Sequence, residues 1–453
     1  MNHLIKTYTY ENGECQRVQL VQLESWESLS FIRPAYHPDS LERFAALYRD
    51  YLVPACPWIF GNMILFSLPP DGEVPFPLHT RWGDVGDSLT AAAAALRQGV
   101  RIIGGKPFFR NAQVKSFWQT LEERGCVRIV CGRLPVTTVI PVGKTTGYLS
   151  EAMPGAPVKV NSSFFIMDRF DCATVYDQVG TPLGLCVKDG EVLNPPLFGR
   201  EALLVDRAGQ VSIHAPDVRE LEIRIGSCTL RHGVNAEIFT RPEQARTPDR
   251  KGMKLVIIGR RVAAVCRQAR VDIPASGFVV CLREPMEIAP GASVSYHGME
   301  HIRFGIQVGN SIVRDGKPTQ NFISRFYNIR RMERVPFPPS LYPIDFQQAR
   351  AARIALGADK HGKPLLLWAE GAPKLGYVPG QHSAGASLAE MADICCGLGM
   401  VNAINLDGGG SAQMLLNGKR HLTLSDRRKA DHAEVERPIP LGLAVMEDIC
   451  ERS

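Results

Sequence analysis

Three consecutive glycines at positions 408–410 constrain this chain more than any other feature. They follow Asp407, which ends an apolar run over residues 401–406. Glycine loses more backbone freedom on folding than any other residue, so a glycine run indicates unusual angles or a close approach of the backbone. We therefore predict a strand at 401–406, a tight turn, and a second strand at 414–416 that an Asn-Gly hairpin signal closes.

The predicted turn brings a carboxylate, a hydroxyl and bare backbone to one place. Asp407 and Ser411 bracket Gly408, Gly409 and Gly410. Backbone N–H groups in a turn form an anion-binding concavity, so this set suits an anionic, hydroxyl-rich ligand. A tight glycine turn with a capping aspartate is the alternative, and the pattern alone does not separate the two.

The residues before the turn predict a helix. Ser387 and Glu390 form a capping box, in which each side chain bonds the backbone N–H of the other residue. Apolar residues then repeat at helical spacing, and glycines at 397 and 399 mark the exit. The unit is therefore helix, strand, glycine turn and strand.

This unit resembles the phosphodiester glycosidases. The resemblance rests on Ser-Ala-Gly-Ala-Ser-Leu-Ala-Glu at 383–390, Ala-Ile-Asn-Leu-Asp-Gly-Gly-Gly-Ser at 403–411 and Glu-Arg-Pro at 436–438. Asn161-Ser-Ser-Phe-Phe adds a weaker match to a family segment that usually reads Asn-Gly-Gly-Phe-Phe. Serine tolerates positive φ poorly, so the two serines bear on the local backbone angles. The resemblance runs from about residue 158 to 445 and is strongest from Arg353 onward.

The resemblance implies hydrolysis of a sugar 1-phosphodiester, such as one of N-acetylglucosamine. The C1–O bond breaks through an oxocarbenium-like transition state, which releases free sugar and a phosphomonoester. It identifies Asp407 as the leading catalytic carboxylate. Glu370 is its candidate partner, because it ends another predicted strand where the family usually has aspartate. For Glu370 alone, a solvent-facing charge at a strand end is the alternative.

The remaining candidate residues would bind the substrate. We expect an arginine to clamp the phosphate, because its planar fork suits that group. The turn N–H groups and a hydroxyl bind the phosphate or a sugar hydroxyl, and an asparagine and a histidine orient the sugar. A second arginine is a further phosphate contact, with a surface ion pair to Glu436 as the alternative. The expected phosphate clamp is Arg353, and the second arginine is Arg437. The turn groups are the N–H groups of Gly408, Gly409 and Gly410 and the Ser411 hydroxyl. The residues expected to orient the sugar are Asn161 and His382, with Ser383 beside them.

The distribution of elements predicts an α+β fold in two parts. Residues 136–453 are expected to form a mixed, β-sheet-rich domain of the phosphodiester glycosidase kind with flanking helices, because short strands dominate and helices come late. Residues 1–135 are expected to form an α/β accessory region with helices near 41–52, 88–96 and 117–123.

One segment matches a zinc-protease sequence pattern but is not predicted to form the helix that the pattern requires. His297-Gly-Met-Glu-His301 has two histidines four residues apart beside a glutamate. That geometry requires a helix, whereas glycine lies inside the segment and strands are predicted on both sides. We therefore expect no zinc site there, although either histidine is a candidate to line a pocket.

Composition indicates which binding partners and which cellular compartment to expect. The net charge of +6 over 453 residues is small and scattered, so nucleic-acid binding is not indicated. Twelve cysteines include no Cys-x-x-Cys pair, which favours a reducing compartment. The N-terminus lacks the apolar core of a secretory signal, and no apolar run approaches the roughly 20 residues of a membrane helix. We expect a cytoplasmic protein with a small-molecule or glycan sugar-phosphodiester substrate and no membrane partner.

Two other functional classes stay open at this stage. One is a non-catalytic protein that binds glycans or sugar phosphates on the same fold, since fold does not fix function. The other is a metal-dependent phosphodiesterase, for which clustered Asp and His pairs would be expected. No cofactor is certain, a divalent cation such as calcium near Asp407 is a candidate, and association of two copies is left open.

Overall fold

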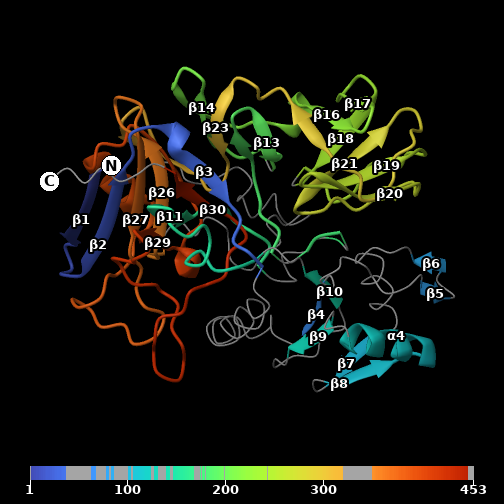
Figure 1. The fold of residues 1–453 in the computed structure, drawn as a ribbon, viewed down its shortest axis with the longest axis horizontal. Coiled ribbons are helices and arrows are strands. Elements are labelled where there is room, and N and C mark those ends of the chain that lie inside the picture. Colours follow the sequence, from blue (N-terminus) through green and yellow to red (C-terminus); the bar gives the residue numbers. More distant parts are fainter. Residues whose placement is uncertain are drawn as a thin grey trace.

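Strands dominate the computed structural model (Figure 1). It describes residues 2–36, 146–167, 174–319 and 349–446, apart from positions 175, 179, 198 and 242. It also describes separate elements between residues 63 and 142. Within these residues the fold is mostly antiparallel sheet with few helices, which agrees broadly with the predicted α+β class.

Seven antiparallel strands form the sheet that carries the candidate site. They are β1 (Asn2–Thr9), β2 (Cys15–Gln22), β24 (Ser311–Arg314), β25 (Lys317–Pro318), β26 (Arg353–Ala358), β27 (Pro364–Ala369) and β28 (Asn402–Asn405). Their order is β1-β2-β27-β26-β28-β24-β25. β26 and β27 are buried along their whole length, and apart from Arg353 at the start of β26 their residues are apolar or glycine.

A second sheet packs on this one. Its strands are β3 (Leu29–Ile32), β11 (Val158–Asn161), β29 (Met414–Leu416) and β30 (Gly442–Val445), in the order β29-β11-β30-β3. Trp368 and Ile404 from the first sheet share one buried core with Val160 and Leu443 from the second. The two sheets form the left half of the view in Figure 1. The predicted strands at 401–406 and 414–416 are therefore confirmed, and they lie in different layers.

Helix α6 (Leu388–Gly397) covers the other face of the seven-stranded sheet. Its Leu388 and Met391 are buried against Ala355 and Leu367. These two strand residues face the helix because successive side chains alternate between the faces of a sheet. The predicted capping box is confirmed: Ser387 Oγ accepts the Glu390 N–H, and the Glu390 carboxylate accepts the Ser387 N–H.

The middle of the chain adds three smaller antiparallel sheets. The first contains β12 (Cys186–Lys188), β13 (Glu191–Asn194), β14 (Ala202–Asp206), β15 (Val211–His214) and β23 (Ile302–Ile306); the second contains β16 (Glu222–Ile225), β17 (Cys228–Leu230) and β22 (Ser295–His297); the third contains β18 (Ala236–Thr240), β19 (Lys254–Ile258), β20 (Arg261–Cys266) and β21 (Gly277–Leu282). The first sheet joins two cores, because Leu203 and Val205 face the core between the two large sheets while Leu204 faces the core of the middle sheets.

The strands β1, β2 and β3 near the start of the chain belong to the two large sheets. β2 pairs with β27, and β3 pairs with β30. Further along lie β4 (Met63–Ser67), β5 (Leu78–Thr80), β6 (Gly83–Val85), β7 (Val100–Ile103), β8 (Lys106–Phe109), α4 (Ala112–Glu123), β9 (Val127–Val130) and β10 (Val139–Val142). α4 confirms the helix predicted at 117–123, and the helices predicted at 41–52 and 88–96 lie outside the described residues. The boundary near residue 135 stays a prediction.

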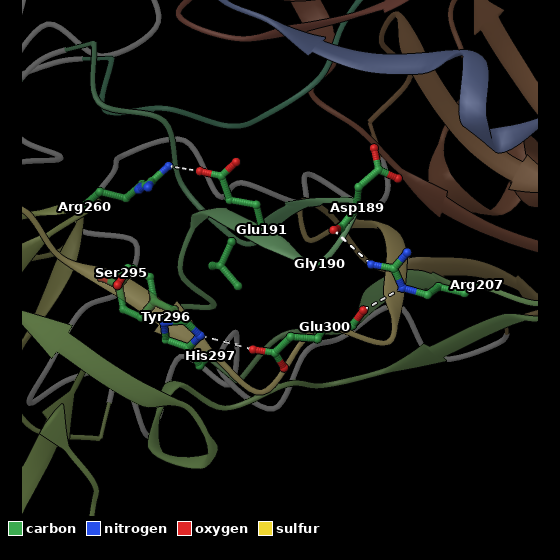
Figure 2. A pocket seen from close by; sticks show the side chains of 10 residues that line it. Asp189, Gly190, Glu191, Arg207, Arg260, Ser295, Tyr296, His297 and Glu300 are labelled. Atoms are coloured by element: carbon green, nitrogen blue, oxygen red, sulfur yellow. Dashed lines mark hydrogen bonds and ion pairs between the residues drawn. The ribbon is translucent and has the colours of Figure 1, made fainter.

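The zinc-protease pattern falls on strand and turn, as expected. β22 ends at His297, Gly298 has a φ of +117°, and β23 begins at residue 302. Because this segment is not helical, the two histidines do not lie one turn apart on a helix, as the zinc-protease pattern requires. Figure 2 shows that His297 lines a surface hollow of about 300 Å³, where its Nδ1 lies 3.2 Å from Oε1 of Glu300.

The described cysteines are free thiols: Cys15, Cys186, Cys228, Cys266, Cys281, Cys395 and Cys396. In the part of the chain that the structure describes, no helix combines the length and apolar character needed to cross a membrane. The cytoplasmic location, the oligomeric state and the expected partners stay predictions.

Candidate functional site

Two carboxylates lie at one edge of the seven-stranded sheet. β26 pairs antiparallel with β27 on one side and with β28 on the other, so both neighbours end where β26 begins. Glu370 directly follows β27, and Asp407 follows β28 after a single residue. They therefore flank the start of β26, where Ala352 and Arg353 lie.

The glycine turn after Asp407 allows close approaches at two of its residues and a left-handed backbone at the third. A Cβ on Gly408 would lie 2.6 Å from the carbonyl oxygen of Ala352. A Cβ on Gly410 would lie 2.1 Å from Nη2 of Arg437 and 2.2 Å from Oδ1 of Asp426. Gly409 has a φ of +59°, in the left-handed region that favours glycine. Each glycine thus has its own physical reason, and together they bring bare backbone against β26 and against an ion pair.

Most of the turn N–H groups bond within the protein. Gly409 N–H donates to Ala352 O at 2.8 Å, and Ser411 N–H donates to Gly408 O at 3.2 Å, within the single 3-10 turn η4 (Gly409–Ser411). The Gly408 N–H points to the Asp407 carboxylate. In this structure the backbone therefore supports the aspartate, and the predicted role of these N–H groups toward phosphate stays a prediction.

Asp407 is buried and incompletely hydrogen-bonded. The residue is 7% exposed, and Oδ2 of its carboxyl group has no hydrogen-bond partner. Burial raises the pKa of the carboxyl to about 7, and the Ser411 hydroxyl, Arg437 and the Gly408 N–H oppose that rise. A buried acid that titrates near neutrality and keeps an unused oxygen is the arrangement expected of a proton-transfer group.

Arg437 joins the Asp407 turn to a second buried acid. Its Nε and Nη2 donate to the two oxygens of Asp426 at 2.9 and 3.2 Å, and its Nη1 lies 3.4 Å from Ser411 Oγ. Lys374 Nζ lies 2.6 Å from Asp426 Oδ1. The alternative pairing of Arg437 with Glu436 is wrong, because Glu436 pairs with Arg420 instead.

The two cations control the ionisation of Asp426. Burial alone would raise the pKa of this fully buried carboxyl, but Arg437 and Lys374 more than offset burial and lower the pKa. Burial in turn lowers the pKa of the Lys374 ammonium, which Asp426 opposes. The two buried acids near the glycine turn therefore have pKa values that move in opposite directions.

Asn161 holds the turn from the second sheet. Its Nδ2 donates to the carbonyl of Asp407 at 2.8 Å, and its Oδ1 accepts the Gln413 N–H at 2.9 Å. Ser162 O accepts the Asp407 N–H at 2.9 Å. Neither Ser162 nor Ser163 has a positive φ, so serine fits where the family usually has glycine. In this structure Asn161 positions Asp407, and its contact with sugar stays a prediction.

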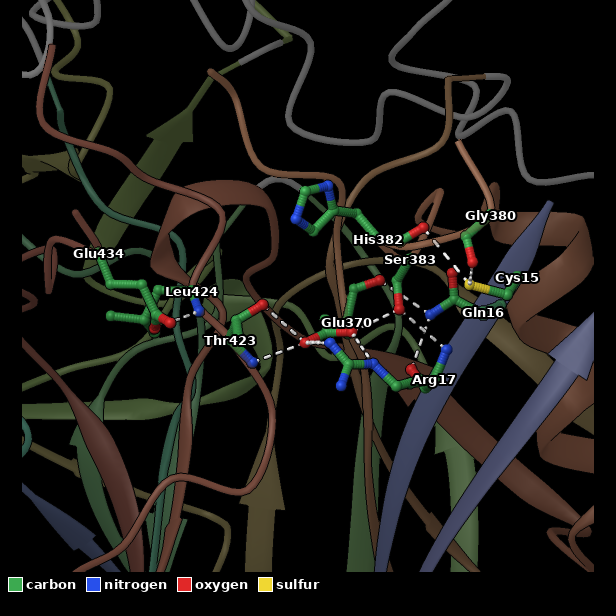
Figure 3. Close-up of polar contacts among 10 residues, drawn as sticks. All are labelled: Cys15, Gln16, Arg17, Glu370, Gly380, His382, Ser383, Thr423, Leu424 and Glu434. Atoms are coloured by element: carbon green, nitrogen blue, oxygen red, sulfur yellow. Dashed lines mark hydrogen bonds and ion pairs between the residues drawn. The ribbon is translucent and has the colours of Figure 1, made fainter. Parts of the chain in front are cut away.

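Glu370 is fully buried and fully hydrogen-bonded (Figure 3). Arg17 donates to both of its oxygens, from Nε at 2.7 Å and from Nη2 at 2.8 Å. Thr423 donates to Oε1 from its N–H and its hydroxyl, each at 2.7 Å, and the Ser383 hydroxyl donates to Oε2. The solvent-facing charge that was the alternative for Glu370 is therefore wrong. The carboxylate joins the N-terminal hairpin to loops at the sheet edge.

Arg353 and His382 border the two acids, and backbone groups of nearby segments hold both side chains. Arg353 is 4% exposed, and its Nε and Nη2 donate to the carbonyls of Ala386 and Ala349 at 3.0 and 2.9 Å. The His382 Nδ1 accepts the Val378 N–H at 2.9 Å, and Figure 3 shows its ring pointing away from Glu370. Their roles toward phosphate and sugar stay predictions.

Four residues of these networks are absent from the sequence-based prediction: Arg17, Lys374, Thr423 and Asp426. Asp426 and Lys374 lie in loops whose sequences are typical of solvent-exposed segments. The glycine run was the one usable signal in the sequence. The structure gives its reason at Gly410, which has no positive φ but has other groups at its Cβ position. Among the described residues, no group of three or more His, Cys, Asp or Glu has metal-binding geometry.

Comparison with known proteins adds a family and several relatives. Among solved structures, the zebrafish N-acetylglucosamine-1-phosphodiester alpha-N-acetylglucosaminidase catalytic domain, auto-inhibited by its pro-peptide, is 13% identical; the alignment covers 99% of this chain and 83% of that chain, with a TM-score of 0.39. A hypothetical protein from Synechocystis is 18% identical over 97% of this chain and 61% of that chain, with a TM-score of 0.40.

The curated relatives match a shorter part of the chain. The N-acetylglucosamine-1-phosphodiester alpha-N-acetylglucosaminidases of Homo sapiens and Mus musculus are each 34% identical over 106 residues, which is 23% of this chain and 19% of each enzyme. Residues 229–446 match the family model described as phosphodiester glycosidase. That range includes Glu370, the glycine turn and Arg437, so this part of the chain is similar to the phosphodiester glycosidase family.

Proposed function

We propose that this protein hydrolyses the glycosidic C1–O bond of a sugar 1-phosphodiester and releases free sugar and a phosphomonoester. The family is one of glycosidases, and its curated relatives above are named for N-acetylglucosamine 1-phosphodiesters. We extend that substrate class to this chain. The observation that carries the proposal is the buried Asp407 carboxyl, with an unpartnered Oδ2 and a pKa raised to about 7.

The reaction needs one carboxylate near C1 and a place for the departing phosphate. As the C1–O bond breaks, its electron pair goes to the phosphate oxygen and positive charge develops on C1. Water adds to C1 and gives a proton to Asp407, which then releases it to solvent. A phosphate ester is already a good leaving group, so the reaction requires no separate acid. General-base help of this kind contributes roughly 100- to 10,000-fold.

The surrounding groups support that role for Asp407. The Ser411 hydroxyl and the Gly408 N–H hold one side of the carboxylate, which leaves Oδ2 for water. Arg437 provides positive charge beside Ser411 Oγ, at 3.4 Å. Preorganised charge of this sort is worth roughly 100- to 1,000-fold for each donor.

Incubation with an N-acetylglucosamine 1-phosphodiester, with and without EDTA, tests the proposal. Free N-acetylglucosamine formed equally in both supports a glycosidase. Sugar phosphate formed only without EDTA would replace the proposal with a metal-dependent phosphodiesterase. Absence of any product, together with saturable binding of the sugar phosphate, would replace it with a glycan-binding protein.

A further inference from the structure

We infer that Lys374, Arg437 and Ser411 form the subsite for the phosphate group, with Asp426 as the buried anchor that fixes both cations. The inference rests on the proposed function, and it assigns the substrate's phosphate to residues that neither the sequence pattern nor the relatives identify as a set. Arg353, the arginine expected from sequence, is not part of it.

The two cations converge on one carboxylate from different loops. Lys374 follows β27 and reaches Asp426 Oδ1 at 2.6 Å, while Arg437 precedes β30 and donates to both oxygens of Asp426. Asp426 is 0% exposed, so neither cation is held by a mobile surface partner. A fully buried acceptor with defined geometry fixes where an ammonium and a guanidinium can point.

The backbone is shaped around this cluster. Gly410 leaves the space that Arg437 and Asp426 occupy, since a Cβ there would lie 2.1 Å from Nη2 and 2.2 Å from Oδ1. Gly371 lies equally close to the next loop, because a Cβ there would be 2.4 Å from Ser425 Oγ. The Lys374 N–H donates to Ser425 O at 2.9 Å, which joins the loop after β27 to the loop of Asp426.

The donor set and its exposure suit a phosphate that enters from solvent. Arginine supplies a planar fork, lysine a point charge and serine a hydroxyl, and all three donate to phosphate oxygens. The Lys374 side chain is 29% exposed, whereas that of Arg437 is 10% exposed, so an entering anion meets the lysine first. Ser411 contacts Arg437 on one side and the Asp407 carboxyl on the other. Ser411 therefore connects the proposed phosphate subsite to Asp407.

Binding of inorganic phosphate tests the subsite without any turnover. Thermal unfolding and titration calorimetry compare phosphate with chloride at equal ionic strength, on the full chain, its Lys374→Met variant and a matched control, Lys254→Met. Lys254 is a buried lysine of β19 whose Nζ donates to the carbonyls of Arg250 and Gln268, away from the proposed subsite. We expect phosphate to raise the Tm of the wild type and of Lys254→Met, and to bind Lys374→Met about 10- to 100-fold more weakly.

Two outcomes overturn the inference: no phosphate-specific binding by the wild type, or equal binding by Lys374→Met. If Lys374→Met fails to fold, Lys374→Gln takes its place, and Lys374→Arg is expected to restore part of the binding. Asp407→Asn separates the inference from the proposed function. This variant should keep phosphate binding and lose sugar release. Phosphate binding by a wild type that itself releases no sugar would leave the subsite standing and reject the glycosidase. If the protein releases sugar and Lys374→Met leaves the KM unchanged, the glycosidase would stand and the phosphate subsite would be rejected.

Discussion

Glu370 and Asp407 follow the two strands that flank β26 in one sheet, yet the two acids have opposite surroundings. The Glu370 carboxylate accepts from Arg17, Thr423 and Ser383, through both oxygens. Asp407 keeps one oxygen without a partner, and burial raises its pKa to about 7. A carboxylate whose two oxygens both accept several hydrogen bonds joins chain segments, whereas one that keeps an oxygen without a partner and has a raised pKa can exchange a proton near neutral pH.

The comparison teaches that position at a strand end does not define a role. Both acids fit the same local pattern of an apolar strand followed by an acid and a glycine. They differ only in what the rest of the chain brings to them. Arg17 comes from the N-terminal hairpin, 353 residues before Glu370, while the cations near Asp407 bond to Asp426 instead.

The largest expected effect is that of Asp407→Asn on activity. We expect sugar release to fall about 1,000-fold or more, because the amide cannot accept the proton of the attacking water. The fold should stay intact, since the neutral amide removes the cost of burying a charge. Product formation with an N-acetylglucosamine 1-phosphodiester and far-ultraviolet circular dichroism measure the two effects. Near-wild-type turnover in the folded variant would remove Asp407 from the reaction.

Gly410→Ala should have the next largest effect. The added methyl group overlaps Arg437 and Asp426, so the ion cluster must move, and such overpacking costs about 1–3 kcal/mol. We expect about 10- to 100-fold less activity, because Arg437 no longer lies beside Ser411. Gly409→Ala is the matched control: no atom lies within 4 Å of its Cβ position, so it meets only the strain of a φ of +59°. Equal loss of activity in both variants would contradict the steric explanation.

The sequence predicted the elements around this site better than the site itself. The capping box at Ser387, the glycine turn and the Asn417-Gly418 hairpin signal act between near neighbours, and the structure shows the helix, the turn and positive φ at both hairpin residues. The ion cluster depends instead on loops that meet only after the sheets have packed. Lys374 and Asp426 are 52 positions apart, with no periodic pattern between them, so a sequence could suggest neither their burial nor their pairing.

The raised pKa of Asp407 should give a smaller effect, on how activity and stability depend on pH. If ionised Asp407 accepts the proton, activity rises about tenfold per pH unit below the folded pKa of about 7 and levels off above it. Stability moves the other way. The folded protein holds this proton from about pH 4 to 7 while the unfolded chain does not, so the free energy of unfolding falls as pH rises through that window, by up to about 1.4 kcal/mol per unit.

Asp407→Asn provides the control for both slopes. Its difference in unfolding free energy from the wild type should grow steadily between pH 4 and 7, because only the wild type loses stability through this group. Denaturant unfolding at a series of pH values measures the difference. A constant difference across the window would place the Asp407 pKa near its ordinary value and weaken the contrast with Glu370.

Glu370→Gln should affect stability more than catalysis. The amide keeps the shape but loses the charge, and its NH2 faces donors, so we expect about 2 kcal/mol less stability; the partial exposure of Arg17, 37% for its side chain, limits the loss. Activity of the folded fraction should change only a few-fold. Urea unfolding and kcat at a temperature where the variant is folded check this. A loss of kcat comparable to that of Asp407→Asn would make Glu370 a second catalytic acid and remove the contrast.

His382→Ala should have the smallest effect and tests whether the Glu370 side of the site contacts sugar at all. The ring accepts the Val378 N–H and is half-buried, so its loss costs little stability. A sugar contact predicts a KM that rises several-fold while kcat stays within about twofold, because binding lost equally in ground and transition states changes only KM. Inhibition by free N-acetylglucosamine should weaken by the same factor, while inhibition by inorganic phosphate should not change. Unchanged inhibition by the sugar would confine substrate binding to the Asp407 side of the sheet edge.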